Sequence, residues 1–98
     1  MSHPNLLLVI NEARDGKTLT AEEAFGEVLR QLRRERGLSQ EQLAEASSCH
    51  RTYISFLERG LRSPTLASLL QLSLALNVPA AEMVRQVEAS IAPSNRQQ

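Results

Sequence analysis

The feature that most constrains the fold is a series of helix-start and helix-stop signals in the middle of the sequence. Thr20 is followed three residues later by Glu23, and this spacing is a capping box, in which the two side chains satisfy free backbone N–H groups at the start of a helix. Ser39 and Gln42 form a second capping box, and Thr65 can cap a further helix. The residues suited to a left-handed stop are Gly37, Gly60 and Asn77. These signals predict an all-α fold.

Five helices are expected, and their apolar residues indicate which sides are buried. The expected ranges are 21–36, 40–46, 50–58, 66–76 and 79–91. The first helix carries one apolar stripe, formed by Phe25, Val28, Leu29 and Leu32. In the third helix, Ile54 and Leu57 lie three residues apart on the buried side. The fourth helix has leucine on almost every side, so it is expected to be the central helix of the domain.

Three segments are expected along the 98 residues. Residues 20–91 form one helical domain, residues 92–98 form a flexible tail, and residues 1–19 form an N-terminal extension of uncertain structure. The apolar run Leu6–Ile10 in this extension fits a helix or a strand. It is far shorter than the roughly 20 residues that span a bilayer, and no basic stretch precedes it, so neither a membrane segment nor a signal peptide is expected. Cys49 is the only cysteine and cannot form an internal disulfide, which favours the cytoplasm.

Few residues of the sequence could serve as catalytic or metal-binding groups. Cys49 and His50 are neighbours in sequence, but a nucleophile and its base need a spatial arrangement that adjacency does not supply. Two histidines and one cysteine do not match a zinc-binding spacing, and there is no glycine-rich phosphate loop. We therefore expect no enzyme, no metal and no cofactor.

Positive charge is concentrated in one region of a chain whose formal net charge is zero. Between Arg30 and Arg62 there are seven arginines against four glutamates, a local excess of three positive charges. Arginine has a planar fork of donors that matches phosphates and guanine edges. The distribution therefore gives mild support to nucleic-acid binding, although the neutral total weakens it.

A short helix, a turn and a second short helix, braced on each side by a longer apolar helix, form the helix-turn-helix arrangement. Three stretches make the pattern specific, namely Leu38–Ala46, Tyr53–Gly60 and Arg62–Leu66. In order and spacing they resemble the Cro and phage-repressor, or Xre-type, helix-turn-helix family over roughly residues 25–84. The chain is also similar to small restriction-modification controller proteins. The resemblance implies a five-helix lambda-repressor-like domain that binds double-stranded DNA.

The second helix of such a motif enters the major groove, which is ~12 Å wide, and its first residues meet base edges. The expected exposed face of this helix consists of Arg51, Thr52, Ser55 and Phe56. The resemblance implies base-reading positions for Arg51, Thr52 and Phe56. Arg51 can hold a guanine through its O6 and N7 atoms, and Phe56 can pack on thymine methyl groups.

Phosphate contacts are expected around the reading helix. The candidates are Gln40, His50, Arg62, Arg36 and Arg34. The resemblance also implies that Gln40 buttresses the reading helix. Two positions depart from the family pattern: Ser48 occupies the turn where the family carries glycine, and His50 stands where the family has a serine or threonine cap.

Four further charged positions have open interpretations. Glu58 and Arg59 lie near the end of the reading helix, where an ion pair between them could brace it. Arg30 and Arg33 are as consistent with a solvated helix face as with a contact to DNA.

A homodimer is expected because one reading helix covers only about half a turn of duplex, and a two-fold pair places two such helices ~34 Å apart. The first candidate for the subunit contact is the apolar face of the last helix, formed by Met83, Val84, Val87 and Ile91. The second candidate is the N-terminal extension with Leu6, Leu8 and Ile10. As a strand this segment could pair with its copy, and as a helix it could pack on the core or on its mate.

Three functions remain open at this point. The first is a repressor or autoregulator that binds a palindromic or pseudopalindromic operator. The second is an antitoxin that binds both its operator and a protein toxin. The third is a protein-interaction module on the same fold. A protein partner such as a toxin or RNA polymerase is compatible with the first two.

Overall fold

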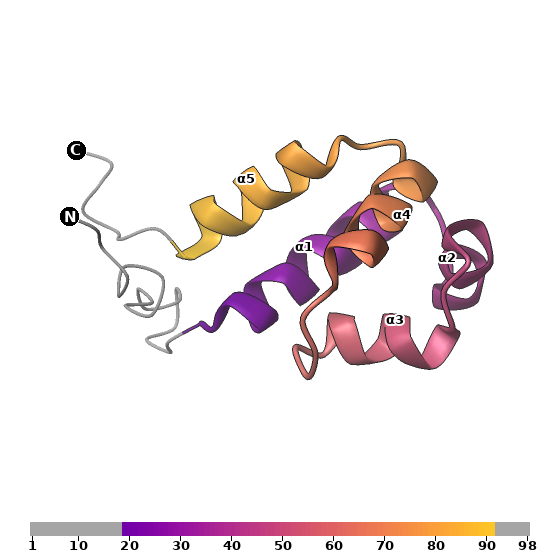
Figure 1. Cartoon of the computed structure of the whole chain (residues 1–98), viewed down its shortest axis with the longest axis horizontal. Coiled ribbons are helices and arrows are strands. Elements are labelled where there is room, and N and C mark those ends of the chain that lie inside the picture. Colours follow the sequence, from indigo (N-terminus) through magenta and orange to yellow (C-terminus); the bar gives the residue numbers. More distant parts are fainter. Residues whose placement is uncertain (1–18, 92–98) are drawn as a thin grey trace.

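The computed structural model describes residues 19–91, and within this range the chain forms five helices and no strand (Figure 1). The helices are α1 (Ala21–Glu35), α2 (Gln40–Ser47), α3 (Arg51–Glu58), α4 (Leu66–Leu76) and α5 (Ala80–Ile91). All five predicted helices are present, and their ends agree with the prediction to within one residue. The segment Leu6–Ile10, one candidate for the subunit contact, lies outside the described residues.

The predicted capping interactions are formed. At the start of α1, the Thr20 hydroxyl accepts a hydrogen bond from the Glu23 N–H at 3.0 Å, and the Glu23 carboxylate accepts one from the Thr20 N–H at 3.0 Å. Ser39 and Gln42 form the same reciprocal pair at the start of α2. The Thr65 hydroxyl caps α4 by accepting from the Ser68 N–H at 3.0 Å. Three of the five helix starts are therefore set by local side-chain chemistry.

The helices end where the sequence predicts left-handed residues. Gly37, Gly60 and Asn77 have φ values of 71°, 74° and 57°. Ser48, which follows α2, also has a left-handed backbone with φ of 62°. A side chain in this region costs energy because its Cβ approaches the following carbonyl oxygen. The turn of the motif is therefore formed by serine in a conformation that glycine adopts more easily.

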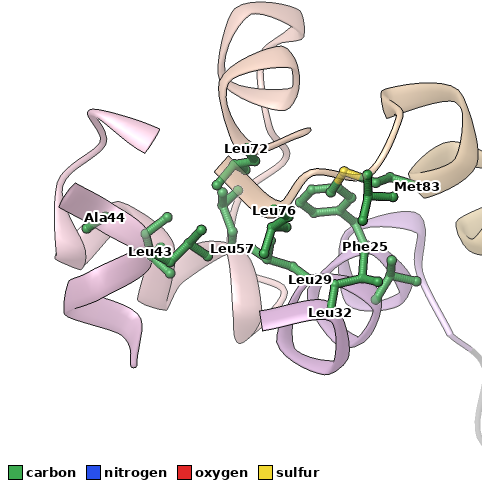
Figure 2. Packing of buried hydrophobic residues seen from close by; sticks show 12 residues of the cluster. Phe25, Leu29, Leu32, Leu43, Ala44, Leu57, Leu72, Leu76 and Met83 are labelled. Atoms are coloured by element: carbon green, nitrogen blue, oxygen red, sulfur yellow. The ribbon is translucent and has the colours of Figure 1, made fainter. Parts of the chain in front are cut away.

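The core lies where α1 meets α3 and α5, and where α2 meets α3 and α4. Leu29, Leu43, Leu57 and Leu76 are among its fully buried side chains, and Figure 2 shows them pointing toward one another. Ala44 is also buried in this cluster, on the side where α2 packs against its neighbours (Figure 2). The small side chain lets α2 approach closely, as its place in the motif predicts.

The prediction that the fourth helix is central was wrong. Only one side of α4, with Leu72 and Leu76, is fully buried, whereas Leu66, Leu70 and Leu74 are exposed. Helix α1 is the more deeply buried of the two, with seven buried residues against three in α4. Apolar residues on every side of α4 predict burial on every side, but they do not show how many of its sides meet other helices. No single helix in residues 19–91 is both long and apolar enough to cross a membrane.

The predicted role of α5 in a subunit contact needs correction at two positions. Met83 is fully buried in the main core, and Figure 2 places it beside Phe25. Ile91 is buried with Leu19 and Ala24 in a smaller cluster. Both side chains are enclosed by their own chain, so they serve its fold and are not available to a second copy. Val87 is partly buried against both clusters, and only Val84 is exposed.

The left-handed turn gives a stability prediction. Replacing Ser48→Gly removes the steric cost of its positive φ, which exceeds the entropy cost of a glycine in the unfolded chain, and should raise the free energy of unfolding by about 0.5–1 kcal/mol. Thermal unfolding followed by circular dichroism measures this. The control is Ala46→Gly, in the helical part of α2, which should lower stability by about 1 kcal/mol. A decrease for both variants would contradict the strain at residue 48.

Candidate nucleic-acid interface

Helix α3 has one buried side and one polar side. Ile54 and Leu57 are fully buried and fix the inner side of the helix. The side chains on the opposite side are Arg51, Thr52, Ser55, Phe56 and Arg59, which we call the outer face of α3. Of these, Arg51, Thr52 and Arg59 are exposed, and Ser55 and Phe56 are half-buried. All four predicted base-contacting residues therefore share one accessible surface.

Arg59 is a member of this surface that the sequence prediction missed. Its guanidinium carbon lies 5.3 Å from the centre of the Phe56 ring, a cation–π distance. The predicted ion pair between Arg59 and Glu58 was wrong, because Glu58 turns to the inside of the protein. The spacing of three residues between an aromatic ring and an arginine on one helix was the signal available in the sequence.

The buried carboxylate of Glu58 is the centre of a polar network. Arg33 of α1 donates from Nε and Nη2 to the two Glu58 oxygens, at 2.6 Å and 2.9 Å. Gln40 of α2 donates from Nε2 to Glu58 Oε1 at 3.0 Å, and Arg30 donates to the Glu58 backbone carbonyl at 3.1 Å. We call these four residues the Glu58 network. It joins α1, α2 and the end of α3, and Arg33 also donates to the Leu38 carbonyl at 2.9 Å.

The network keeps Glu58 ionised in spite of its burial. Burial by itself would raise the pKa of this carboxyl, but the hydrogen bonds from Arg33 and Gln40 and the charges of Arg33 and Arg30 outweigh it and lower the pKa. The hydrogen bond to Glu58 raises the pKa of Arg33, although burial of the guanidinium opposes the rise. Arg33 is therefore a structural residue. The sequence could not separate it from a solvated arginine.

A close backbone contact holds the same end of α3 against α1. A Cβ atom added at Gly26 would lie 2.5 Å from the Leu57 carbonyl oxygen and 2.6 Å from the Glu58 carbonyl oxygen. These are backbone atoms, so the two helices would have to separate to make room. Glycine at this position of α1 lets α3 lie close enough for Arg30 and Arg33 to reach Glu58.

The other end of α3 is open. His50 is the N-cap residue, and its side chain makes no capping hydrogen bond, in agreement with the expected departure from a serine or threonine cap. Its side chain is exposed next to the first N–H groups of the helix. Arg51 Nε lies 4.0 Å from a Glu41 oxygen, but both side chains are largely exposed, so this ion pair is weak.

The predicted phosphate contacts fall into different surroundings. Gln40 is partly engaged by Glu58, as the buttressing role implies. Arg62 is exposed in the loop between α3 and α4. Arg34 is exposed on α1 and lines a shallow hollow with Glu27 and Glu35, so its surroundings carry both signs of charge.

Arg36, the remaining predicted phosphate contact, makes hydrogen bonds within the chain. Its Nε atom donates to the Leu76 carbonyl at 2.7 Å, and Nη2 lies 3.5 Å from the Asn77 carbonyl oxygen. These carbonyl groups stand at the end of α4, where they lack partners within the helix. The guanidinium group of Arg36 is thus used to cap α4, while Arg36 as a whole remains exposed, so a phosphate contact stays a prediction.

The chain is similar to known helix-turn-helix proteins in both sequence and structure. Residues 29–83 match the family described as helix-turn-helix. Control protein C.SmaI of Serratia marcescens is 51% identical over 55 residues, which cover 56% of this chain and 66% of that protein. The solved structure of the restriction-modification controller C.AhdI from Aeromonas hydrophila superimposes with a TM-score of 0.62 at 42% identity, covering 63% of this chain and 94% of that one. The controller C.Esp1396I, solved as a tetramer with its natural 35 base-pair operator, gives 0.66 at 32% identity and covers 72% and 93%.

The Glu58 network gives a prediction for stability and its pH dependence. Glu58→Gln leaves Arg33 without its counter-ion and should lower the free energy of unfolding at pH 7 by about 3 kcal/mol. Because the folded pKa of Glu58 is lowered, its contribution is complete above the unfolded pKa of about 4.5 and is lost as the pH falls through the folded value. Urea unfolding between pH 3 and pH 7 should therefore give a flatter profile for the variant.

The matched control is Glu41→Gln, which removes an exposed carboxylate of α2 and should change stability by less than about 1 kcal/mol. If Glu58→Gln unfolded at the same urea concentration as this control, the network would not be holding the helices together.

Proposed function

The chain belongs to the helix-turn-helix family, and from this premise we propose that it is a sequence-specific DNA-binding transcription regulator. The family is one of DNA-binding regulators and not of enzymes. The observation that carries the proposal is the outer face of α3, a row of polar and cationic side chains opposite a fully buried side. A helix with this exposed side fits the major groove, which is ~12 Å wide.

Arg51 and Thr52 are the proposed base-reading residues at the start of α3. Both are exposed in its first turn, the part of a recognition helix that approaches base edges. Arg51 has two donors in the geometry that guanine O6 and N7 accept. The weak pair with Glu41 holds the guanidinium loosely, so that a guanine can replace the carboxylate.

Phe56 and Arg59 are proposed to act together further along the helix. The guanidinium of Arg59 lies over the half-buried Phe56 ring, which places a positive charge beside the aromatic side chain. The ring suits contact with thymine methyl groups, and the charge suits a nearby phosphate. Ser55, which is half-buried on the same face, can contribute a hydroxyl to either contact.

Phosphate contacts are proposed for His50, Arg62, Gln40 and Arg34. His50 stands at the N-terminus of α3, where the helix dipole and free N–H groups favour an anion. Arg62 follows the opposite end of α3, so the two side chains can hold the backbone on both sides of the groove. Such contacts position the protein and do not select sequence.

We further propose that two copies bind one operator with two-fold symmetry. One α3 helix covers only about half a turn of DNA, and a two-fold pair places two such helices one turn apart. The related C.Esp1396I occupies its 35 base-pair operator as a tetramer, an even number of subunits. A palindromic or pseudopalindromic site follows from this arrangement.

Regulation of its own promoter, or repression of a neighbouring one, is the proposed activity in the cell. The similarity to control proteins of restriction-modification systems favours this over an antitoxin role. A protein that acts on promoter DNA in this way works in the cytoplasm.

A binding experiment distinguishes the proposed base-reading role of Arg51 from the proposed phosphate contact of Arg62. After the operator is identified by selection from random DNA, Arg51→Ala should weaken binding to it by ~1–3 kcal/mol and relax the preference at one base pair. Arg62→Ala should weaken all sequences alike and reduce the dependence on salt by about one charge. Gel-shift titrations at several salt concentrations measure both effects.

Arg85→Ala is the control, since this exposed arginine of α5 pairs with Glu82 and lies on a helix that does not contribute to the outer face of α3. Equal losses for Arg51→Ala on the operator and on random DNA would refute base reading by Arg51. Binding that does not weaken with salt would refute DNA binding as a whole.

A further inference from the structure

The loop that joins α3 to α4 carries Arg62, one of the proposed phosphate contacts. Its first residues are fixed by the end of α3. The Leu61 N–H donates to the Phe56 carbonyl at 2.9 Å, and the Gly60 N–H donates to the Leu57 carbonyl at 3.1 Å. Together with the left-handed backbone of Gly60, these two bonds form a Schellman motif, which closes the end of a helix.

The other end of this loop is fixed by α4. The Thr65 hydroxyl caps that helix by accepting from the Ser68 N–H at 3.0 Å. The Thr65 N–H also donates to the Tyr53 hydroxyl at 3.4 Å, which ties this end of the loop to α3. Arg62 and Ser63 lie between the two fixed ends.

A hydrogen bond to α1 holds the middle of the loop. The Ser63 hydroxyl donates to Glu22 Oε2 at 3.0 Å, across 41 positions of the sequence. Glu22 belongs to the first turn of α1 and is half-buried. Gly60 lets the same two segments approach each other, because a Cβ atom added there would lie 2.8 Å from Cγ and 3.0 Å from Cα of Glu23. The loop is therefore packed against the start of α1.

Few other interactions hold the middle of the loop. Leu61 is 58% exposed, so burial of its side chain adds little, and Arg62 is also exposed. Within residues 19–91, the bond from Ser63 to Glu22 is the one hydrogen bond that a side chain of residues 61–63 makes. A single bond close to solvent adds little to the stability of the whole fold. Its effect is local, since it reduces the number of conformations open to the loop.

We propose that Glu22 and Ser63 are positioning residues for DNA binding, which hold the loop in the conformation that presents Arg62 to a phosphate. This inference rests on the proposed function, in which Arg62 contacts the DNA backbone. Binding has to order any loop and any long side chain that moves in the free protein, and this ordering costs free energy. A loop that α1 already holds has part of this cost removed, so the complex is tighter without a DNA contact by Glu22 or Ser63.

The charge of Glu22 acts in the opposite direction. A carboxylate beside a loop that contacts phosphates repels them. Removing the charge alone should therefore strengthen binding, whereas removing the hydrogen-bond acceptor should weaken it. The two effects can be separated, because a glutamine side chain keeps an oxygen that accepts a hydrogen bond and an alanine side chain does not.

The test compares Glu22→Gln with Glu22→Ala, two variants of equal charge. Glu22→Gln should bind DNA at least as tightly as the wild-type chain. Glu22→Ala should bind about 3–10-fold more weakly than Glu22→Gln, the range that corresponds to ordering one long side chain. The ratio should be the same on the operator and on random DNA, as expected for a phosphate contact. Gel-shift titrations at fixed salt measure it.

The difference between the two variants should disappear in an Arg62→Ala background, because no arginine is left to be positioned. A merely structural role of Glu22 would leave the difference in place. The matched control is the pair Glu27→Gln and Glu27→Ala, at an exposed position of the same helix, and these two variants should bind alike.

The order of the loop is measured separately, by NMR relaxation without DNA. The N–H order parameter of Arg62 should be near the rigid value of about 0.85 in the wild-type chain and in Glu22→Gln, and it should fall toward about 0.6 in Glu22→Ala. Ser63→Ala removes the donor and should cause the same loss of order and of affinity relative to the wild-type chain. It therefore replaces Glu22→Ala if that variant fails to fold.

The inference and the proposed function fail in different ways. Equal affinities of Glu22→Gln and Glu22→Ala, or a difference that persists in the Arg62→Ala background, would overturn the positioning role and leave the proposed function in place. An absence of salt-dependent DNA binding by the wild-type chain would refute the proposed function and this inference with it.

Discussion

The orientation of α3 depends on the buried carboxylate of Glu58. With eight residues, α3 is shorter than the roughly 12–15 residues that an isolated helix needs to be even marginally stable in water, so its geometry is imposed by its neighbours. Ile54 and Leu57 determine which side faces inward, but apolar contacts have no fixed direction. The bidentate bonds from Arg33 to Glu58 do have one, because the planar guanidinium and the carboxylate must align. An inward-facing carboxylate on α3 thus holds the opposite side of that helix outward.

Two further contacts fix the orientation of α3, and they act at opposite ends of this helix. Gly26 lets the backbone of α1 approach the last turn of α3, which brings Arg30 and Arg33 within reach of Glu58. Tyr53, near the start of α3, hydrogen bonds to Ser68 on α4. A buried ion pair adds little net stability compared with apolar side chains of the same volume. Its contribution here is the direction of α3, which a leucine at position 58 would not specify.

The helices and their ends could be predicted from the sequence because the signals are local. The capping boxes of α1 and α2 each join residues three positions apart, and the left-handed stops are single residues. The Glu58 network could not be predicted, because Arg33 and Glu58 are 25 residues apart and each alone resembles a solvated charge. The bond from Arg36 to the Leu76 carbonyl could not be predicted for the same reason, since the two residues are 40 positions apart. The spacing of apolar residues did not predict the buried side of α4, because this helix is apolar on all sides and no side stands out as the one that meets the core.

The use of arginine inside the fold changes how the charge of the chain should be interpreted. The excess of three positive charges between Arg30 and Arg62 counts side chains that the structure uses internally. Arg33 neutralises Glu58, Arg30 binds its carbonyl, and Arg36 caps α4. The exposed arginines of that stretch are Arg34, Arg36, Arg51, Arg59 and Arg62, and exposed Glu35, Glu41 and Glu45 oppose them. An interface with so small an excess attracts phosphates weakly over distance, so the proposed DNA interface would depend chiefly on short-range contacts of the outer face of α3. Short-range contacts need a helix in a fixed orientation. The buried pair of Arg33 and Glu58 and the close approach at Gly26 hold α3 in such an orientation.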